Sequence, residues 1–421
     1  MTDSTNGANL TDGFDLIDPQ PYAKNGTPHA SWTALRRHDP LHRCEPAGYA
    51  PFWAVTKHAD VITISRQPKL FLNAPRLAVF PDIPEMNPED RPARHLLNMD
   101  PPDHAKFRKL ASARFTPRAV QSLRPSIERI ADDLLDKLIA DGGTHECDFV
   151  EAVSARLPLE VLADLLGVPR SDWNLLFQWT NETIGASDPE YQHGATSQET
   201  AMNARLSLFQ YFMGMVEERR KKPTDDITSL LAHATVDGAE IPAFELLSYY
   251  FLLVVAGNET TRNATSGGLL ALIENPGELV KLKRDPSLID SAVEEIVRWT
   301  TPVIQFCRTA AEDTEVRGQK IRKGQSLCLF YPSANRDEEV FDDPFAFRVD
   351  RNPNPHLAFG IGEHFCMGAN LARLELRVAF AKIAERVAEI ELAGDVARLH
   401  SSFVGGIKRV PIRYRLERRA A

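Results

Sequence analysis

The chain has 421 residues, of which 43% are hydrophobic and 25% charged, and a formal net charge of -9 at pH 7. This composition is typical of a soluble globular protein with ample core material, and the negative charge excludes a general attraction to nucleic acid or anionic membranes. The five widely spaced cysteines lack a C-x-x-C pair, which excludes a disulfide framework and a zinc ribbon, and no run of about 18 apolar residues predicts a membrane span. We therefore expect a cytoplasmic protein.

The N-terminal part is expected to begin with a flexible tail, residues 1–12, because Asn, Thr, Asp and Gly dominate it. One large domain would then occupy residues 13–421. Within it, the residue pattern predicts a short helix at 29–38 and a hairpin of strands at 41–44 and 52–56.

A proline-rich stretch at residues 73–98 shows no period and indicates a long irregular loop. The Pro-Pro-Asp sequence at residues 101–103 then starts a helix expected to run to about residue 115. His104 and Arg108 are four residues apart and share one face of that helix. Two such donors can bind a buried carboxylate, although an exposed surface pair is the alternative.

Residues 125–211 alternate helical patterns with short breaks and are interpreted as helical scaffold. The longest helical stretch, 244–274, is apolar nearly all round in its first half, as in a helix buried in a protein interior. A glycine, a carboxylate and two hydroxyls interrupt it in the sequence Ala256-Gly257-Asn258-Glu259-Thr260-Thr261. Polar residues in a core helix point to function, and a threonine can bond back to the i−4 carbonyl, although an ordinary helix kink is the alternative.

The last third of the chain carries two further motifs. Glu295 and Arg298 lie one helical turn apart and can pair, and strands are expected at 316–321 and 327–331. The sequence Phe359-Gly360-Ile361-Gly362-Glu363-His364-Phe365-Cys366-Met367-Gly368 precedes a helical pattern at 369–380. A helix N-terminus favours a thiolate, so Cys366 is a candidate metal ligand, and a buried free cysteine is the alternative.

In this order, the four motifs resemble those of the cytochrome P-450 family over roughly residues 28–410. The resemblance implies a mostly α, single large domain with many helices and small β-sheets. It also implies haem b, buried between the long central helix and the cysteine-loop helix, with Cys366 as the iron ligand. Further haem-binding residues by family position are His104, Arg108, Ala256, Gly257, Arg308, Phe359, His364 and Gly368.

The same resemblance assigns catalytic roles to Thr260, which would bond to the bound oxygen species, and Glu259, which would relay protons from water. Glu295 and Arg298 would form a structural ion pair. Many members have an arginine where this chain has Ala346, so the third contact of that network is missing or comes from a neighbour such as Arg348.

The expected substrate pocket is apolar, which predicts a hydrophobic substrate. Its candidate residues are Leu77, Val79, Val255, Val303, Ile304 and Phe403, and a helix pair within 173–216 would form a mobile lid over it. The segments 179–190 and 257–268 look most like those of members that act on terpenoids, sterols or methyl-branched lipids, and aromatic hydrocarbons are an alternative.

The implied activity is hydroxylation with dioxygen and two electrons from a separate ferredoxin and ferredoxin reductase, by a monomer bound to neither membrane nor nucleic acid. The ferredoxin would dock behind Cys366, on a basic patch of Arg114, Arg118, Arg373 and Arg377. Alternatives are a peroxygenase on the same fold and a non-enzymatic haem sensor.

Overall fold

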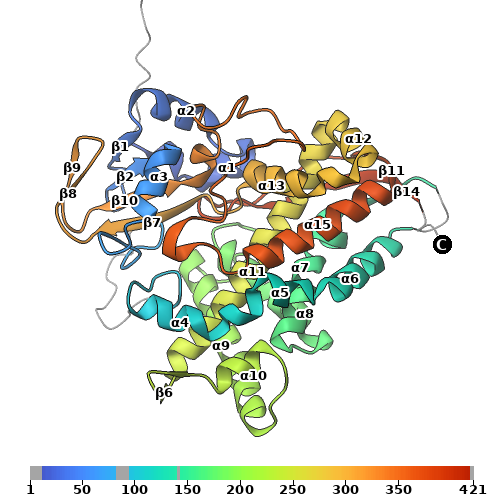
Figure 1. Cartoon of the computed structure of the whole chain (residues 1–421), viewed down its shortest axis with the longest axis horizontal. Coiled ribbons are helices and arrows are strands. Elements are labelled where there is room, and N and C mark those ends of the chain that lie inside the picture. Colours follow the sequence, from blue (N-terminus) through green and yellow to red (C-terminus); the bar gives the residue numbers. More distant parts are fainter. Residues whose placement is uncertain (1–11, 82–93, 140–142, 418–421) are drawn as a thin grey trace, which may run out of the picture.

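The computed structural model describes residues 12–81, 94–139 and 143–417 (Figure 1), so nearly all of the predicted tail lies outside the described residues. The α-helices are α1 Pro19–Asn25, α2 His29–His38, α3 His58–Ser65, α4 Asp103–Ser112, α5 Pro117–Gln121, α6 Arg124–Asp136, α7 Arg156–Leu166, α8 Trp173–Ile184, α9 Ser197–Lys221, α10 Ile227–Ala232, α11 Ala243–Glu274, α12 Pro276–Arg284, α13 Ile289–Thr300, α14 Tyr331–Ala334 and α15 Ala369–Arg386. The strands are β1 Leu41–Cys44, β2 Phe52–Val55, β3 Phe71–Leu72, β4 His145–Asp148, β5 Thr235–Val236, β6 Ala239–Glu240, β7 Gln305–Ala310, β8 Thr314–Val316, β9 Gln319–Ile321, β10 Ser326–Phe330, β11 Val387–Leu392, β12 Ala397–Arg398, β13 Ile407–Arg409 and β14 Pro411–Leu416.

The prediction of a mostly helical fold with small sheets is confirmed. Helix α2 has the predicted bounds, the β1–β2 hairpin ends one residue earlier than predicted, and α11 begins one residue earlier. Prolines fix both ends of α11, because Pro242 precedes its first residue and Pro276 opens the next helix. The strand predicted at 327–331 begins and ends one residue earlier, and Tyr331 instead starts α14.

Helix α11 crosses the middle of the molecule, with α15 lying beside it (Figure 1). Gly268 allows this close approach, because a Cβ at that position would lie 2.6 Å from Phe380 of α15 and 2.7 Å from Ile296 of α13. Helices α7, α8 and α9 contact α11 as well. Helices pack against α11 on several sides, and this packing fixes the position of its polar interruption within the protein interior.

The main sheet has the strand order β1-β2-β10-β7-β3, in which only β2 and β10 pair in parallel. A smaller sheet has the order β11-β14-β4. Strand β4 lies in the stretch that was interpreted as helical scaffold, so that interpretation is wrong for residues 145–148. Its partner, β14, is more than 260 residues away, with Pro411 opposite Asp148.

Candidate active site

The loop at residues 359–368 places Cys366 just before helix α15. A 3-10 turn at Gly362–His364 precedes the cysteine. Gly362 has φ +78°, and a Cβ there would lie 2.5 Å from the carbonyl oxygen of Ser65, so only glycine fits the turn. The Cys366 N–H donates to the carbonyl oxygen of Phe359 at 2.9 Å. The predicted placement of the thiol at a helix N-terminus is therefore confirmed.

A cavity of about 250 Å³ is lined by Cys366 and by the polar interruption of α11. The helix contributes Ala256, Gly257, Thr260, Thr261 and Ala264 to the lining. The Thr260 hydroxyl donates to the carbonyl oxygen of Ala256 at 2.8 Å, which is the predicted bond to the i−4 residue. The thiol and this hydroxyl thus belong to the walls of one cavity.

Four basic side chains also line the cavity: His104, Arg108, Arg308 and His364. Arg108 donates to the carbonyl oxygen of Phe365 at 2.7 Å, which ties α4 to the cysteine loop. His104 and His364 lie ring against ring with centroids 4.0 Å apart. Burial, together with the neighbouring His104 and the two arginines, lowers the pKa of His364 to about 2. The structure therefore brings together the four side chains that sequence reasoning assigned to carboxylate binding.

Sequence reasoning missed an acidic residue in this basic group. Glu363 Oε1 lies 3.0 Å from Nδ1 of His104, and the Glu363 side chain is 24% exposed. Its position next to His364 in the cysteine loop was the only signal that could have drawn attention to it.

Glu259 is fully buried, but it is not part of the cavity lining. One carboxylate oxygen pairs with Arg262, one turn further along α11, and the other has no partner among the described residues. Arg262 in turn donates to Oδ1 of Asn181 on α8 at 2.7 Å. Burial raises the pKa of Glu259, and Arg262 opposes that shift. Of the two predicted catalytic residues, Thr260 therefore lines the cavity, whereas Glu259 contacts Arg262 outside the cavity lining.

Of the six predicted substrate-pocket residues, only Val303 lines this cavity. Val79 and Ile304 lie in a buried cluster beside the main sheet, Val255 is buried on α11, and the Leu77 carbonyl accepts from Cys307. Phe403 contacts Phe306 edge to face with centroids 5.7 Å apart. Apolar lining residues that the prediction did not include are Leu96, Leu97, Leu162, Leu252, Leu253 and Phe306.

Glu375 of α15 is a second lining residue that sequence reasoning missed. It is 3% exposed, and its Oε2 has no partner among the described residues. Burial raises the pKa of this carboxyl group to about 8. The helical period alone could have indicated that Glu375 shares the buried face of α15 with Leu371 and Leu374.

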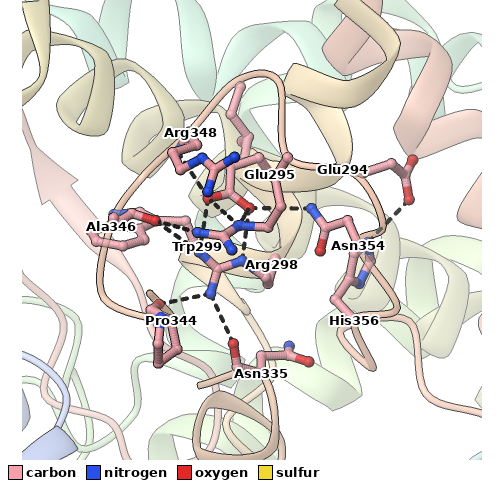
Figure 2. A network of polar contacts seen from close by, with 12 residues as sticks. Glu294, Glu295, Arg298, Trp299, Asn335, Pro344, Ala346, Arg348, Asn354 and His356 are labelled. Atoms are coloured by element: carbon pink, nitrogen blue, oxygen red, sulfur yellow. Dashed lines mark hydrogen bonds and ion pairs between the residues drawn. The ribbon is translucent and has the colours of Figure 1, made fainter. Parts of the chain in front are cut away.

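Glu295 and Arg298 form the predicted ion pair, with Arg298 Nε 2.7 Å and Nη2 2.8 Å from the carboxylate oxygens (Figure 2). Both side chains are fully buried. The suggestion that the Arg348 side chain completes the network is wrong, because only its backbone N–H donates to Glu295, at 3.0 Å. Arg351 supplies the second guanidinium, 3.0 and 3.1 Å from the two carboxylate oxygens.

Three of the four arginines in the predicted docking patch already have acidic partners. Arg373 binds Glu294 through two hydrogen bonds of 2.6 and 2.8 Å. Arg377 Nε lies 2.5 Å from Asp290, and Arg114 pairs with Asp225. Arg118 is exposed. The surface is therefore of mixed charge, because each of these three arginines is paired with a carboxylate.

The donors around the cavity fit a haem. Among the described residues no cluster of three or more histidine, cysteine or acidic side chains could hold a bare metal ion, so a metal bound by Cys366 must bring further ligands of its own. The cavity offers a thiol, an apolar wall for a flat ring, and basic side chains for carboxylates, among them the buried, unpartnered Nε2 of His364. Cys366 is open to the cavity, but the protein packed around it disfavours the charged form and raises the pKa of the thiol, so a positive iron would help to hold it as a thiolate.

Comparisons with known proteins agree with this geometry. The family model described as Cytochrome P450 matches residues 191–387. A steroid C26-monooxygenase of Mycolicibacterium smegmatis is 40% identical over 415 residues, which cover 96% of this chain and 95% of the relative. A methyl-branched lipid omega-hydroxylase of Mycobacterium tuberculosis is 40% identical over 365 residues, covering 86% of this chain and 83% of the relative.

A solved structure leads to the same family. The crystal structure of CYP108D1 from Novosphingobium aromaticivorans matches with a TM-score of 0.87 and 36% identity, and covers 96% of this chain and 98% of that one. No helix in the described part of the chain is long and apolar enough to cross a membrane. Members of the matched family carry haem b on a cysteine thiolate, and its named relatives are monooxygenases of hydrophobic molecules. The chain belongs to the cytochrome P450 family.

Proposed function

We propose that this enzyme hydroxylates a sterol or a methyl-branched lipid, or else a terpenoid, within the cavity between Cys366 and α11. The observation that carries the proposal is the apolar lining of that cavity, to which leucines and Phe306 contribute. The steroid and lipid names of the two relatives support the first two classes. An aromatic hydrocarbon is the alternative, because the lining is apolar without being specific to one shape.

In the proposed mechanism the bound haem supplies the activation of dioxygen, and the chain supplies its position, its protons and its surroundings. Cys366 would ligate the iron, and its thiolate would donate electron density to it. The haem carboxylates would be held by charge-assisted hydrogen bonds from His104, Arg108, Arg308 and His364. Ala256 and Gly257 leave space in the α11 wall of the cavity, because neither has a side chain beyond Cβ.

Thr260 and Glu259 would deliver protons during the reaction. The Thr260 hydroxyl belongs to the cavity wall, whereas Glu259 faces Arg262 behind it. Proton delivery therefore needs either water between the two residues or a rotation of Glu259 away from Arg262. A carboxyl group that is protonated, and therefore neutral, can donate a proton to Thr260 or to a water, and burial favours that form.

We propose that the electrons come from a ferredoxin that is itself reduced by a ferredoxin reductase. We propose the surface behind Cys366 as the docking site, with Arg118 as its exposed cation. Charge attraction of this kind weakens as salt rises. Arg118→Glu should lower the rate of reduction by ferredoxin, whereas a rate that is indifferent to both salt and this change would exclude the site.

The substrate class is tested by a spectral binding screen on the purified ferric enzyme, followed by product analysis under labelled dioxygen. We expect sterols or branched lipids to displace water from the iron and to gain one labelled oxygen atom. Turnover with peroxide that far exceeds turnover with dioxygen and ferredoxin would favour a peroxygenase. Ligand binding without any substrate-dependent oxygen uptake would favour a haem sensor.

A further inference from the structure

Glu363 holds one ring nitrogen of His104. The carboxylate lies 3.0 Å from Nδ1, and the histidine is 1% exposed, so the imidazole is sheltered from water although Glu363 is 24% exposed. His104 also lines the cavity, and no described residue bonds to its other ring nitrogen, Nε2. The two nitrogens therefore have different partners: a carboxylate at Nδ1 and the cavity at Nε2.

The chemistry of the pair fixes where the imidazole proton lies. An ionised carboxylate only accepts hydrogen bonds, so Nδ1 must carry the hydrogen. A neutral imidazole has a single N–H, which leaves Nε2 as an acceptor. A haem carboxylate is also an acceptor. Neutral His104 paired with Glu363 therefore cannot donate to it.

We propose that Glu363 is a positioning residue that couples haem binding to the uptake of one proton by His104. With Glu363 at Nδ1, His104 donates to a haem carboxylate through Nε2 only as the imidazolium ion. The inference rests on the proposed function, in which His104 holds a haem carboxylate.

The charged groups around His104 agree with a change of protonation on binding. Burial lowers the pKa of His104, Glu363 and Asp100 raise it, and Arg108 lowers it, so that its pKa lies below 6.5 without haem. His364 stacks on its ring, and Arg308 faces His364 from β7. A haem carboxylate at Nε2 adds a second negative partner, which favours the charged ring.

The shift of the His104 pKa on haem binding determines how haem affinity changes with pH. The pKa of His104 is higher with haem bound than without it. Haem affinity is therefore highest below the pKa of the free form and falls as pH rises toward the pKa of the bound form, by about tenfold per pH unit for one proton. The rate of haem loss should therefore rise with pH between the pKa of the free form, which lies below 6.5, and the pKa of the bound form.

The test measures haem transfer from the holoenzyme to excess apomyoglobin at a series of pH values that begins below 6.5 and extends above it. We expect the wild type to lose haem up to about tenfold faster per pH unit. Glu363→Gln should flatten this slope, because an amide can donate to Nδ1 and leave the hydrogen on Nε2. Glu363→Asp should restore it. Glu391→Gln, a change of an exposed acid on β11, is the matched control and should keep the wild-type slope.

His104→Gln provides a second variant, and it should also abolish the slope. A slope unchanged in Glu363→Gln or in His104→Gln overturns the inference, as does a flat profile in the wild type. The spectrum of the reduced carbon monoxide complex separates the two hypotheses. If the wild type lacks the thiolate signature, the proposed function fails. If the signature is present but the variants lose haem with the same pH slope as the wild type, only the coupling through Glu363 fails.

Discussion

Arg351 Nε donates to both carboxylate oxygens of Glu295, and this contact closes the buried network that Arg298 begins. The remaining nitrogens of Arg351 bond to the carbonyl oxygens of Asp342, Asp343 and Ala346 at 2.6 to 3.1 Å. Ala346 therefore contributes its backbone, while the guanidinium comes from five residues further along the chain. Two arginines then share a single buried carboxylate.

Arg351→Ala should destabilise the protein strongly. It leaves the Glu295–Arg298 pair with one cation fewer and takes a donor from three carbonyl oxygens, although those of Asp343 and Ala346 keep one from Ala346 N–H and from Arg298. Removal of one partner from a buried ion pair costs about 3–5 kcal/mol. Arg348→Ala is the matched control, because that side chain is 43% exposed and its ion pair in the described part of the chain is a long one, 3.7 Å to Asp350. Its effect should stay within about 0.5 kcal/mol. Urea denaturation measures both, and equal losses would contradict the assignment.

Gly362→Ala should reduce haem content and stability. The substitution places a Cβ at 2.5 Å from the Ser65 carbonyl oxygen on a backbone with φ +78°, and strain of this kind costs about 1–3 kcal/mol. Gly277→Ala on α12 has open space around its Cβ and should leave both properties unchanged. Haem content per protein, read from the absorbance ratio, distinguishes the two. A normal haem content in Gly362→Ala would refute the fixed turn.

Glu375 should make stability depend on pH. Its pKa of about 8 in the folded state exceeds the unfolded value of 4.5, so the folded protein binds more protons between these pH values. The contribution of Glu375 to stability is then greatest below pH 4.5 and is lost as pH rises from there to about 8, by up to about 1.4 kcal/mol per pH unit.

Glu375→Gln should remove that fall and be more stable than the wild type near pH 8. Glu385→Gln changes an exposed acid on the same helix and serves as the control. Denaturation at a series of pH values measures the difference. Parallel curves for the wild type and Glu375→Gln would show that the carboxyl group is ionised, and so stabilised by a partner, throughout.

Thr260→Ala and Glu259→Gln should uncouple oxygen consumption from product formation. Each removes a group proposed to move protons, and the loss of general acid catalysis slows a reaction by about 10²–10⁴. Thr265→Ala is the control, since its hydroxyl bonds to the Thr261 carbonyl at 2.8 Å and lies outside the cavity lining. The ratio of product to oxygen consumed is the measurement. If both variants keep the wild-type ratio, neither residue relays protons.

The motifs that lie in one local stretch were readily predicted. The glycines, the cysteine and the following helix each have a local signal, and so does the polar interruption of α11, which the structure confirms by the Thr260 bond to Ala256. The bounds of α11 were predictable because prolines mark both of its ends.

Features that depend on distant partners were not predictable. Strand β4 forms because β14 pairs with it, and the sequence around residue 145 carries no local signal of a partner so far along the chain. Arg348 and Arg351 are equally basic in sequence, and only the course of the chain decides which one reaches Glu295. The cavity lining was mostly missed for the same reason, since an apolar residue in a loop carries no sign of whether it faces a cavity or the core.

The bond between Cys366 and iron is tested most directly by the absorption spectrum of the reduced enzyme under carbon monoxide. The wild type should show the red-shifted band of thiolate-bound haem, and Cys366→Ala should lose it. A wild-type spectrum without that band, or an unchanged band in Cys366→Ala, would contradict the assignment.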